Sequence, residues 1–150
     1  MELRNGMGRS MTKRPIFTLL LLGIVLACPG AFADQNAVGP ATAAAEAWLK
    51  LVDAGHYQGS YKDTSSYFKS RISERKWVEK VEPVRKPLGA MISRKVQGAQ
   101  YTTSLPGAPD GQYVVIQFDT SFQNKKSAIE TVTSMLDKDG KWHVSGYFIR

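Results

Sequence analysis

Four runs in the second half of the chain alternate between apolar and polar residues, and this pattern limits the fold more than any other feature. The runs cover residues 91–103, 113–122, 127–136 and 142–149. Alternation with period two, rich in β-branched and aromatic residues, is typical of strands that bury one face. The last two breaks are short enough for hairpin loops, so we expect the strands to be antiparallel neighbours in one sheet.

The phase of each run predicts which side chains face the interior. In 113–122, Val114, Ile116 and Phe118 share one face and Asp119 lies on the other. In the last run the expected pattern places Trp142, Val144 and Phe148 opposite His143, Ser145 and Tyr147. An antiparallel sheet normally packs one face and exposes the other, so the more apolar sets should face a helical layer.

The helical layer is predicted from the residues before the sheet. From Ala41 the sequence ATAAAEAWLKLVDAG repeats apolar residues at helical spacing and stops at Gly55, a residue typical of a helix C-terminus. One or two short helical turns are expected over 57–68. Ser73 is a suitable N-cap for a further helix, with Trp77, Val81, Val84 and Leu88 along one side. Pro83 should kink or end that helix near Glu82.

The N-terminal residues have the order of a secretory signal. Lys13 and Arg14 precede the apolar run IFTLLLLGIVLA, and Ala31-Phe32-Ala33 follows as a small-residue cleavage site. The apolar run is shorter than the roughly 20 residues that cross a bilayer. We therefore expect a signal peptide over 1–33 cleaved after Ala33, a flexible leader over 34–40 and one domain over 41–150, located in the periplasm or outside the cell.

Cys28 is the single cysteine and allows one alternative to this location. It follows Val25-Leu26-Ala27, which loosely resembles a lipobox, so lipidation at Cys28 would give a lipoprotein. Cleavage after Ala33 is the favoured interpretation. The mature chain would then contain no cysteine, which excludes disulfides, thiol catalysis and cysteine-based metal sites.

Positive charge gathers between residues 69 and 95. The formal net charge of +7 falls to +4 without residues 1–33, because four basic residues and one acidic residue leave with them. The basic residues of the cluster are Lys69, Arg71, Arg75, Lys76, Lys80, Arg85, Lys86, Arg94 and Lys95. We favour a solvated helix face over a surface for anionic lipid, and we expect no nucleic-acid partner, since no such motif occurs.

Several stretches of the chain resemble an exported bacterial family of unknown function, domain of unknown function 4019. They are YTTSLPGAPDG at 101–111 followed by Tyr113-Val114-Val115, Ala47-Trp48-Leu49 with Asp53-Ala54-Gly55, Trp77, Arg85 with Pro87-Leu88-Gly89, Glu130-Thr131-Val132-Thr133, and Trp142 with Gly146-Tyr147-Phe148-Ile149. The resemblance implies an α+β fold of the nuclear-transport-factor-2-like (NTF2-like) or cystatin-like kind, with N-terminal helices packed on a curved four-stranded antiparallel sheet. It implies no activity, and fold analogy alone supports none.

The residues suggest few catalytic sites. His56 and His143 are the only histidines, and no hydrolase, phosphate-binding or dinucleotide motif is present, so we predict no metal and no cofactor. Glu130 lies in phase with Ala128 and Val132 and could be an inward acid or base. Asp119 and Tyr147 are alternatives on the other phase. For Glu130 we favour an ion pair with a lysine or arginine on a neighbouring strand.

Three functions remain open at this point. The favoured one is a non-catalytic protein of the cell envelope that binds a small ligand or a partner protein, with Tyr57, Tyr61, Tyr101 and Tyr113 as candidate ligand contacts. A small isomerase-like or hydratase-like enzyme with an inward carboxylate is the second. Docking of the basic face on anionic envelope lipid is the third. Homodimers through the exposed sheet face are common in the implied architecture.

Overall fold

The computed structural model describes residues 30–150, and the side chains from residue 36 onward. Its helices are α1 (Gly30–Asp53), α2 (Tyr57–Lys62), α3 (Ser66–Arg71) and α4 (Glu74–Arg85), followed by the 3-10 turn η1 (Lys86–Leu88). Its strands are β1 (Met91–Thr102), β2 (Tyr113–Phe122), β3 (Ala128–Leu136) and β4 (Trp142–Ile149). The predicted strands are therefore confirmed to within one residue at each end.

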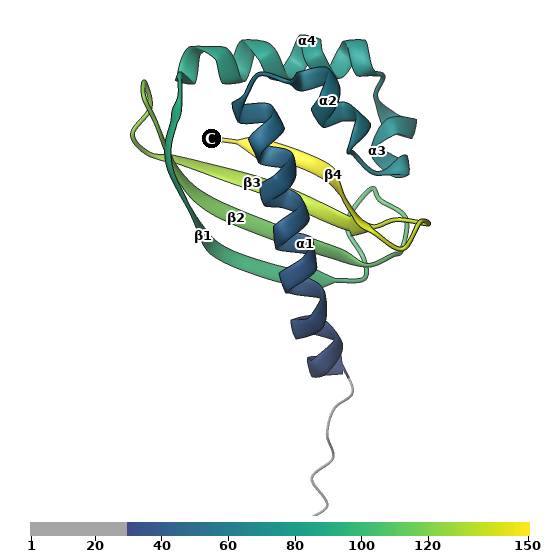
Figure 1. Cartoon of the computed structure of the whole chain (residues 1–150). Coiled ribbons are helices and arrows are strands. Elements are labelled where there is room, and N and C mark those ends of the chain that lie inside the picture. Colours follow the sequence, from purple (N-terminus) through teal and green to yellow (C-terminus); the bar gives the residue numbers. More distant parts are fainter. Residues whose placement is uncertain (1–29) are drawn as a thin grey trace, which may run out of the picture.

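The four strands form one antiparallel sheet in the order β1-β2-β3-β4. Helix α1 crosses one face of this curved sheet, and α4 runs above the sheet with α2 and α3 beside it (Figure 1). The other face carries no helix in the described part of the chain. The predicted α+β class, with helices before a strand meander, is confirmed.

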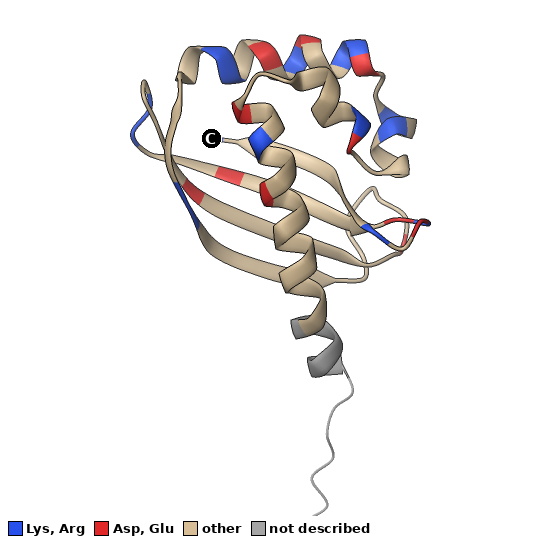
Figure 2. Ribbon diagram, in the orientation of Figure 1, with Lys and Arg blue, Asp and Glu red and all other residues tan. Residues whose placement is uncertain are grey.

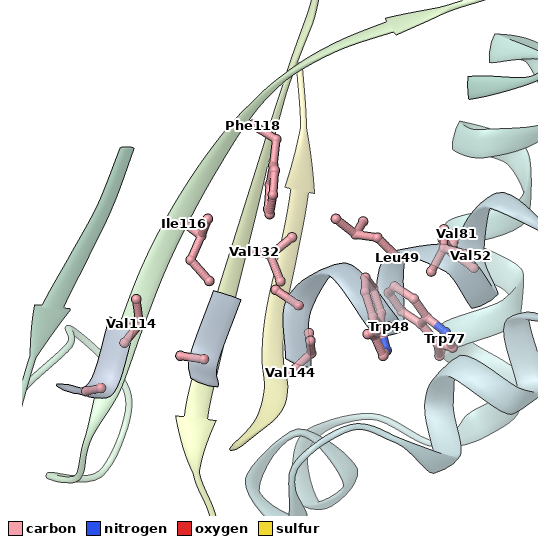
Figure 3. Packing of buried hydrophobic residues seen from close by; sticks show 13 residues of the cluster. Trp48, Leu49, Val52, Trp77, Val81, Val114, Ile116, Phe118, Val132 and Val144 are labelled. Carbon is pink, nitrogen blue, oxygen red and sulfur yellow. The ribbon is translucent and has the colours of Figure 1, made fainter. Parts of the chain in front are cut away.

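The core lies between α1 and the sheet. Val114, Ile116 and Phe118 of β2 are buried, as the alternation predicted, and they face the helical layer (Figure 3). Trp48 and Leu49 of α1 pack against them from the other side. Each large apolar side chain buried in this way stabilises the fold by about 1.5–3 kcal/mol, so the sheet and α1 hold each other in place.

Helix α1 is longer than predicted. It begins at Gly30, so residues 34–40, expected to be a flexible leader, are helical. Ala37 and Ala41 are buried, and their small side chains let the helix lie close to the sheet. Pro40 lacks one backbone donor, and packing of these alanines offsets that loss. The predicted cleavage site at Ala33 falls in the first turn of α1, whereas Cys28 and the apolar signal run lie outside the described residues.

Helix α4 passes through Pro83 and ends at Arg85, so it continues three residues beyond Glu82, where a kink or an end was predicted. Ser73 is its N-cap, as predicted, and accepts a hydrogen bond from the Lys76 N–H. Pro83 lies in the last turn, where only one helical hydrogen bond is lost, and the Lys86 N–H still reaches the Glu82 carbonyl. The buried residues of α4 are Trp77, Val81 and Arg85, whereas Val84, predicted on the same side as Trp77 and Val81, is 47% exposed.

A β-bulge in β4 reverses the predicted phase of its second half. Thr133 pairs with Gly146 but Ser134 pairs with Val144, so the strand contains one extra residue at this point. Beyond the bulge Tyr147 points to the helix side, where its ring packs against that of Trp48, and Phe148 points outward with 62% exposure. The predicted faces of Tyr147 and Phe148 are thus wrong. The prediction assumed a strand without a bulge, in which side chains alternate strictly between the two faces.

Candidate functional site

A buried carboxylate lies on the helix-covered face of the sheet. Glu130 of β3 has no exposed surface. Its Oε2 accepts hydrogen bonds from Arg94 Nε at 2.7 Å and from Thr120 Oγ1 at 2.6 Å, and its Oε1 accepts one from the Tyr147 hydroxyl at 2.6 Å. Three donors thus hold one carboxylate, and both of its oxygens are occupied.

Asp53, the last residue of α1, extends this arrangement into what we call the ion-pair cluster. Its carboxylate accepts two hydrogen bonds from Arg94, at 2.7 and 2.9 Å, and one from Arg85 Nη2 at 2.6 Å. A negative charge at a helix C-terminus is unfavourable because it lies beside the negative end of the helix dipole. The two guanidinium groups compensate for this charge, so the cluster joins α1, α4, β1 and β3.

Arg85 is the unexpected member of the cluster. Its side chain is only 3% exposed, and its guanidinium lies 4.3 Å from the centre of the Phe122 ring, in cation–π geometry. Sequence reasoning placed Arg85 among the solvated basic residues. The signal that could have found it is spacing, since Arg85 follows Trp77 and Val81 at intervals of four on the same helix face.

Contacts within the cluster shift the pKa values of Arg94 and Tyr147. Burial lowers the pKa of Arg94, but hydrogen bonds and charge from Asp53 and Glu130 outweigh it, and the net shift is upward. Burial, and then the charge and hydrogen bond of Glu130, raise the pKa of Tyr147 far above its ordinary value. Arg94 therefore stays charged and Tyr147 stays neutral, which suits a fixed network and not a proton relay.

Beside the cluster lies an open, mainly apolar depression of about 350 Å³, which we call the α4–β4 groove. Its lining residues are Phe68, Ile72, Trp77, Lys80, Val81, Val84, Tyr147, Phe148 and Ile149. Tyr147 belongs to both features, because its hydroxyl enters the cluster while the residue lines the groove. Lys80 is the one charged residue in this lining, so the groove combines apolar walls with a single cation.

Residues of both charge signs follow one another along α4 (Figure 2). Arg75 pairs with Glu79 and Lys86 pairs with Glu82, each at 3.2 Å and one helical turn apart. Such exposed pairs contribute little stability but reduce the local positive charge. This arrangement favours the solvated helix face that the sequence suggested for α4.

Asp137, just after β3, anchors the short helix α3 that forms one wall of the groove. Its carboxylate accepts hydrogen bonds from the backbone N–H and the hydroxyl of Ser66, at 2.5 and 2.6 Å. Desolvation acts to raise the pKa of Asp137, but the Ser66 and Lys138 hydrogen bonds and the charge of His143 outweigh it and lower the pKa to about 2. This contact fixes α3 to the β3–β4 hairpin.

The other candidate residues from the sequence do not join the cluster. Asp119 is exposed on the sheet face opposite α1. His143 contacts Asp139 at 2.9 Å, whereas His56 precedes α2 and is exposed. Among residues 30–150 no three His, Cys, Asp or Glu side chains are grouped as a metal site would require.

The four candidate tyrosines make separate contacts. The Tyr61 hydroxyl donates to the Ile72 carbonyl at 3.0 Å and the buried Tyr113 hydroxyl donates to the Pro109 carbonyl at 2.6 Å. Tyr101 contacts the Gln112 side chain at 3.4 Å, and Tyr57 lines a small polar depression that also includes Asp53. The groove was missed because its walls come from three separate segments, and the bulge in β4 displaces one of them from its predicted phase.

The molecule is thus a small α+β domain with a largely buried ion-pair cluster and an open apolar groove. Residues 44–147 match the family model described as a protein of unknown function, DUF4019, and the chain belongs to this family. Neither the comparison with curated proteins nor that with solved structures found a match. None of the helices in the described part is long and apolar enough to cross a bilayer.

Proposed function

We propose that this domain is a non-catalytic binding protein of the cell envelope, which holds an apolar part of a small ligand or partner protein in the α4–β4 groove. The observation that carries the proposal is the groove itself. It is open to solvent, and it has two large, well-exposed apolar side chains, Val84 and Phe148, at its walls. Exposed apolar surface around a hollow is typical of a binding site.

The state of Glu130 supports binding in preference to catalysis. A general acid or base must come within hydrogen-bond reach of its substrate. Glu130 is fully buried, and three donors already occupy its two oxygens. A substrate would have to displace Arg94, Thr120 or Tyr147, which would leave a buried charge without its partners.

The cellular setting is part of the same proposal. The order of charged residues, apolar run and small residues before residue 34 supports export by a cleaved signal peptide. The helical layer on a curved antiparallel sheet supports kinship with the NTF2-like or cystatin-like architecture.

Titration with 1-anilinonaphthalene-8-sulfonate, an apolar dye with one negative charge, tests the proposal. We expect saturable fluorescence enhancement with one dye molecule per chain, because the lining of the groove combines apolar residues for the rings of the dye with Lys80 for its sulfonate. Val84→Asp should weaken binding about tenfold, or about 1.4 kcal/mol.

Val96→Asp on β1 is the matched control, since Val96 is 45% exposed and Val84 is 47% exposed. Neither change should disturb the core. Equal weakening in both variants, or no saturable binding by the wild type, would overturn the proposed site.

A further inference from the structure

We infer that the occupant of the α4–β4 groove is an extended segment of another polypeptide, which pairs as an added strand with the free edge of β4. This inference rests on the proposed function and specifies its ligand. The segment has apolar residues at alternate positions and acidic residues nearby. The inference depends on the backbone of β4 as well as on the side chains of the groove.

The lining of the groove places it along an edge of the sheet. Tyr147 and Ile149 pair with the inward residues Val132 and Glu130, so their side chains lie on the helix side. Phe148 lies on the opposite side, yet all three consecutive residues line the groove. A hollow that touches both faces of one strand must run along the edge of that strand.

The register shows which backbone groups point into this edge. Arg150 and Ile129 exchange two hydrogen bonds, at 3.0 and 3.1 Å. Hydrogen-bonded pairs alternate along an antiparallel ladder, so Phe148 also bonds to β3, while the N–H and C=O of Tyr147 and Ile149 point away from it. Within residues 30–150 these four groups have no other hydrogen bond.

The same edge already pairs with a single bridging residue of another segment, before the bulge. Thr64 forms a parallel bridge with Val144, and the Ser65 N–H donates to the Val144 carbonyl at 2.9 Å. Helix α3 then begins at Ser66 and leaves the remainder of the edge uncovered. The fold therefore covers the edge before the bulge and leaves it free after the bulge, beside the apolar groove.

The β1 edge at the other side of the sheet is a poorer pairing surface. Its register is interrupted twice, between Met91 and Ser93 and between Val96 and Gly98. Irregularities of this kind, together with charged residues such as Lys95, protect edges from added strands. The part of β4 after the bulge keeps a constant register from Gly146 to Ile149.

Geometry and charge define the segment that fits. Antiparallel pairing with both Tyr147 and Ile149 requires three consecutive residues, of which the outer two would face Trp77 and Val81 of α4 and should be apolar. Lys80 has no acidic neighbour in the groove lining, so acidic flanking residues would complement it. A second copy of this chain would bring a second Lys80 and no acidic group from its own groove lining, which disfavours self-pairing.

The probe is an acetylated and amidated peptide of sequence Glu-Val-Thr-Val-Glu. In the free protein, amide hydrogen exchange measured by NMR should be fast at Tyr147 and Ile149 and slow at Phe148 and Arg150. Saturating peptide should slow exchange at Tyr147 and Ile149 tenfold or more, on the order expected for new hydrogen bonds, and leave Phe148 unchanged.

The control peptide carries N-methyl groups on both valines, which removes the two donors needed for pairing. It should bind at least about tenfold more weakly. Equal binding of both peptides, or binding without protection of Tyr147 and Ile149, overturns the added strand and leaves the dye-binding groove intact. Failure of both dye and peptide to bind overturns the proposed function as well. A free protein that is dimeric, with Tyr147 and Ile149 already protected, identifies a second copy as the occupant and overturns the inference.

Discussion

The ion-pair cluster and the α4–β4 groove are neighbours with opposite properties. In the cluster, charged groups are buried and bonded to one another, whereas in the groove apolar groups face solvent. The two features meet in adjacent residues of α4, because Arg85 enters the cluster and Val84 faces the groove. Burying charge is expensive unless the charges are paired, and exposing apolar surface forgoes burial energy. We therefore expect the cluster to maintain the shape of the groove, where the proposed function places the bound ligand.

Removing the central cation should cause the largest effect. Arg94→Met leaves Asp53 and Glu130 without their shared partner, and the loss in free energy of unfolding should be about 3–5 kcal/mol. Urea denaturation measures this loss. The neighbouring exposed residue provides the control, and Lys95→Met should change stability by less than about 0.5 kcal/mol. Similar values for the two variants would show that the cluster contributes no special stability.

A smaller change separates the two features at the residue they share. Tyr147→Phe removes the hydroxyl donor to Glu130 Oε1 but keeps the ring beside the groove. Stability should fall by about 1.5–3 kcal/mol, as for the loss of a hydrogen bond to a charged group. Dye affinity should stay within about twofold of the wild type. A loss of dye binding with full stability would reverse the assignment of roles.

The anchoring of α3 gives a pH dependence. Folding lowers the pKa of Asp137 to about 2, so its ionised form stabilises the fold above pH 4, and this contribution disappears as the pH falls from about 4 to about 2. Asp137→Asn should lower stability at neutral pH by about 1 kcal/mol and flatten the stability curve in that acid range. Thermal unfolding at several pH values measures this effect, with Asp119→Asn as the exposed control. An unchanged acid-range slope would contradict the anchoring role.

The smallest effect is expected at the single cation of the groove. Lys80→Met removes a charge without narrowing the groove, so stability should be unchanged and affinity for the anionic dye should fall by about 0.5 kcal/mol, or ~2-fold. The wild-type affinity should weaken with added salt, and the variant should lose most of that dependence. A salt dependence equal to that of the wild type would place the dye elsewhere.

The elements with regular local patterns were predictable from the sequence. Strand positions follow from alternation and turn residues, and Ser73 follows from N-cap preference. The inward position of Glu130 followed from its phase with Ala128 and Val132. The favoured ion pair was also found, although its partner Arg94 is on β1, with β2 between the two strands.

The remaining features depend on contacts distant in sequence or on breaks in a pattern. Asp53 and Arg94 are 41 positions apart, and nothing local marks them as partners. The bulge near Gly146 turns Tyr147 inward, which strict alternation does not allow. The burial of Arg85 became possible because Asp53 and Phe122 meet it in space. The groove itself depends in part on the bulge in β4.

A crystal structure of the protein with bound 1-anilinonaphthalene-8-sulfonate would test the central claim most directly. The account predicts dye density between Trp77, Val84 and Phe148, with the three hydrogen bonds to Glu130 unchanged. Dye that displaces Tyr147 from Glu130, or that contacts Arg94, would show that the cluster binds ligands and contradict the division between a structural cluster and a binding groove.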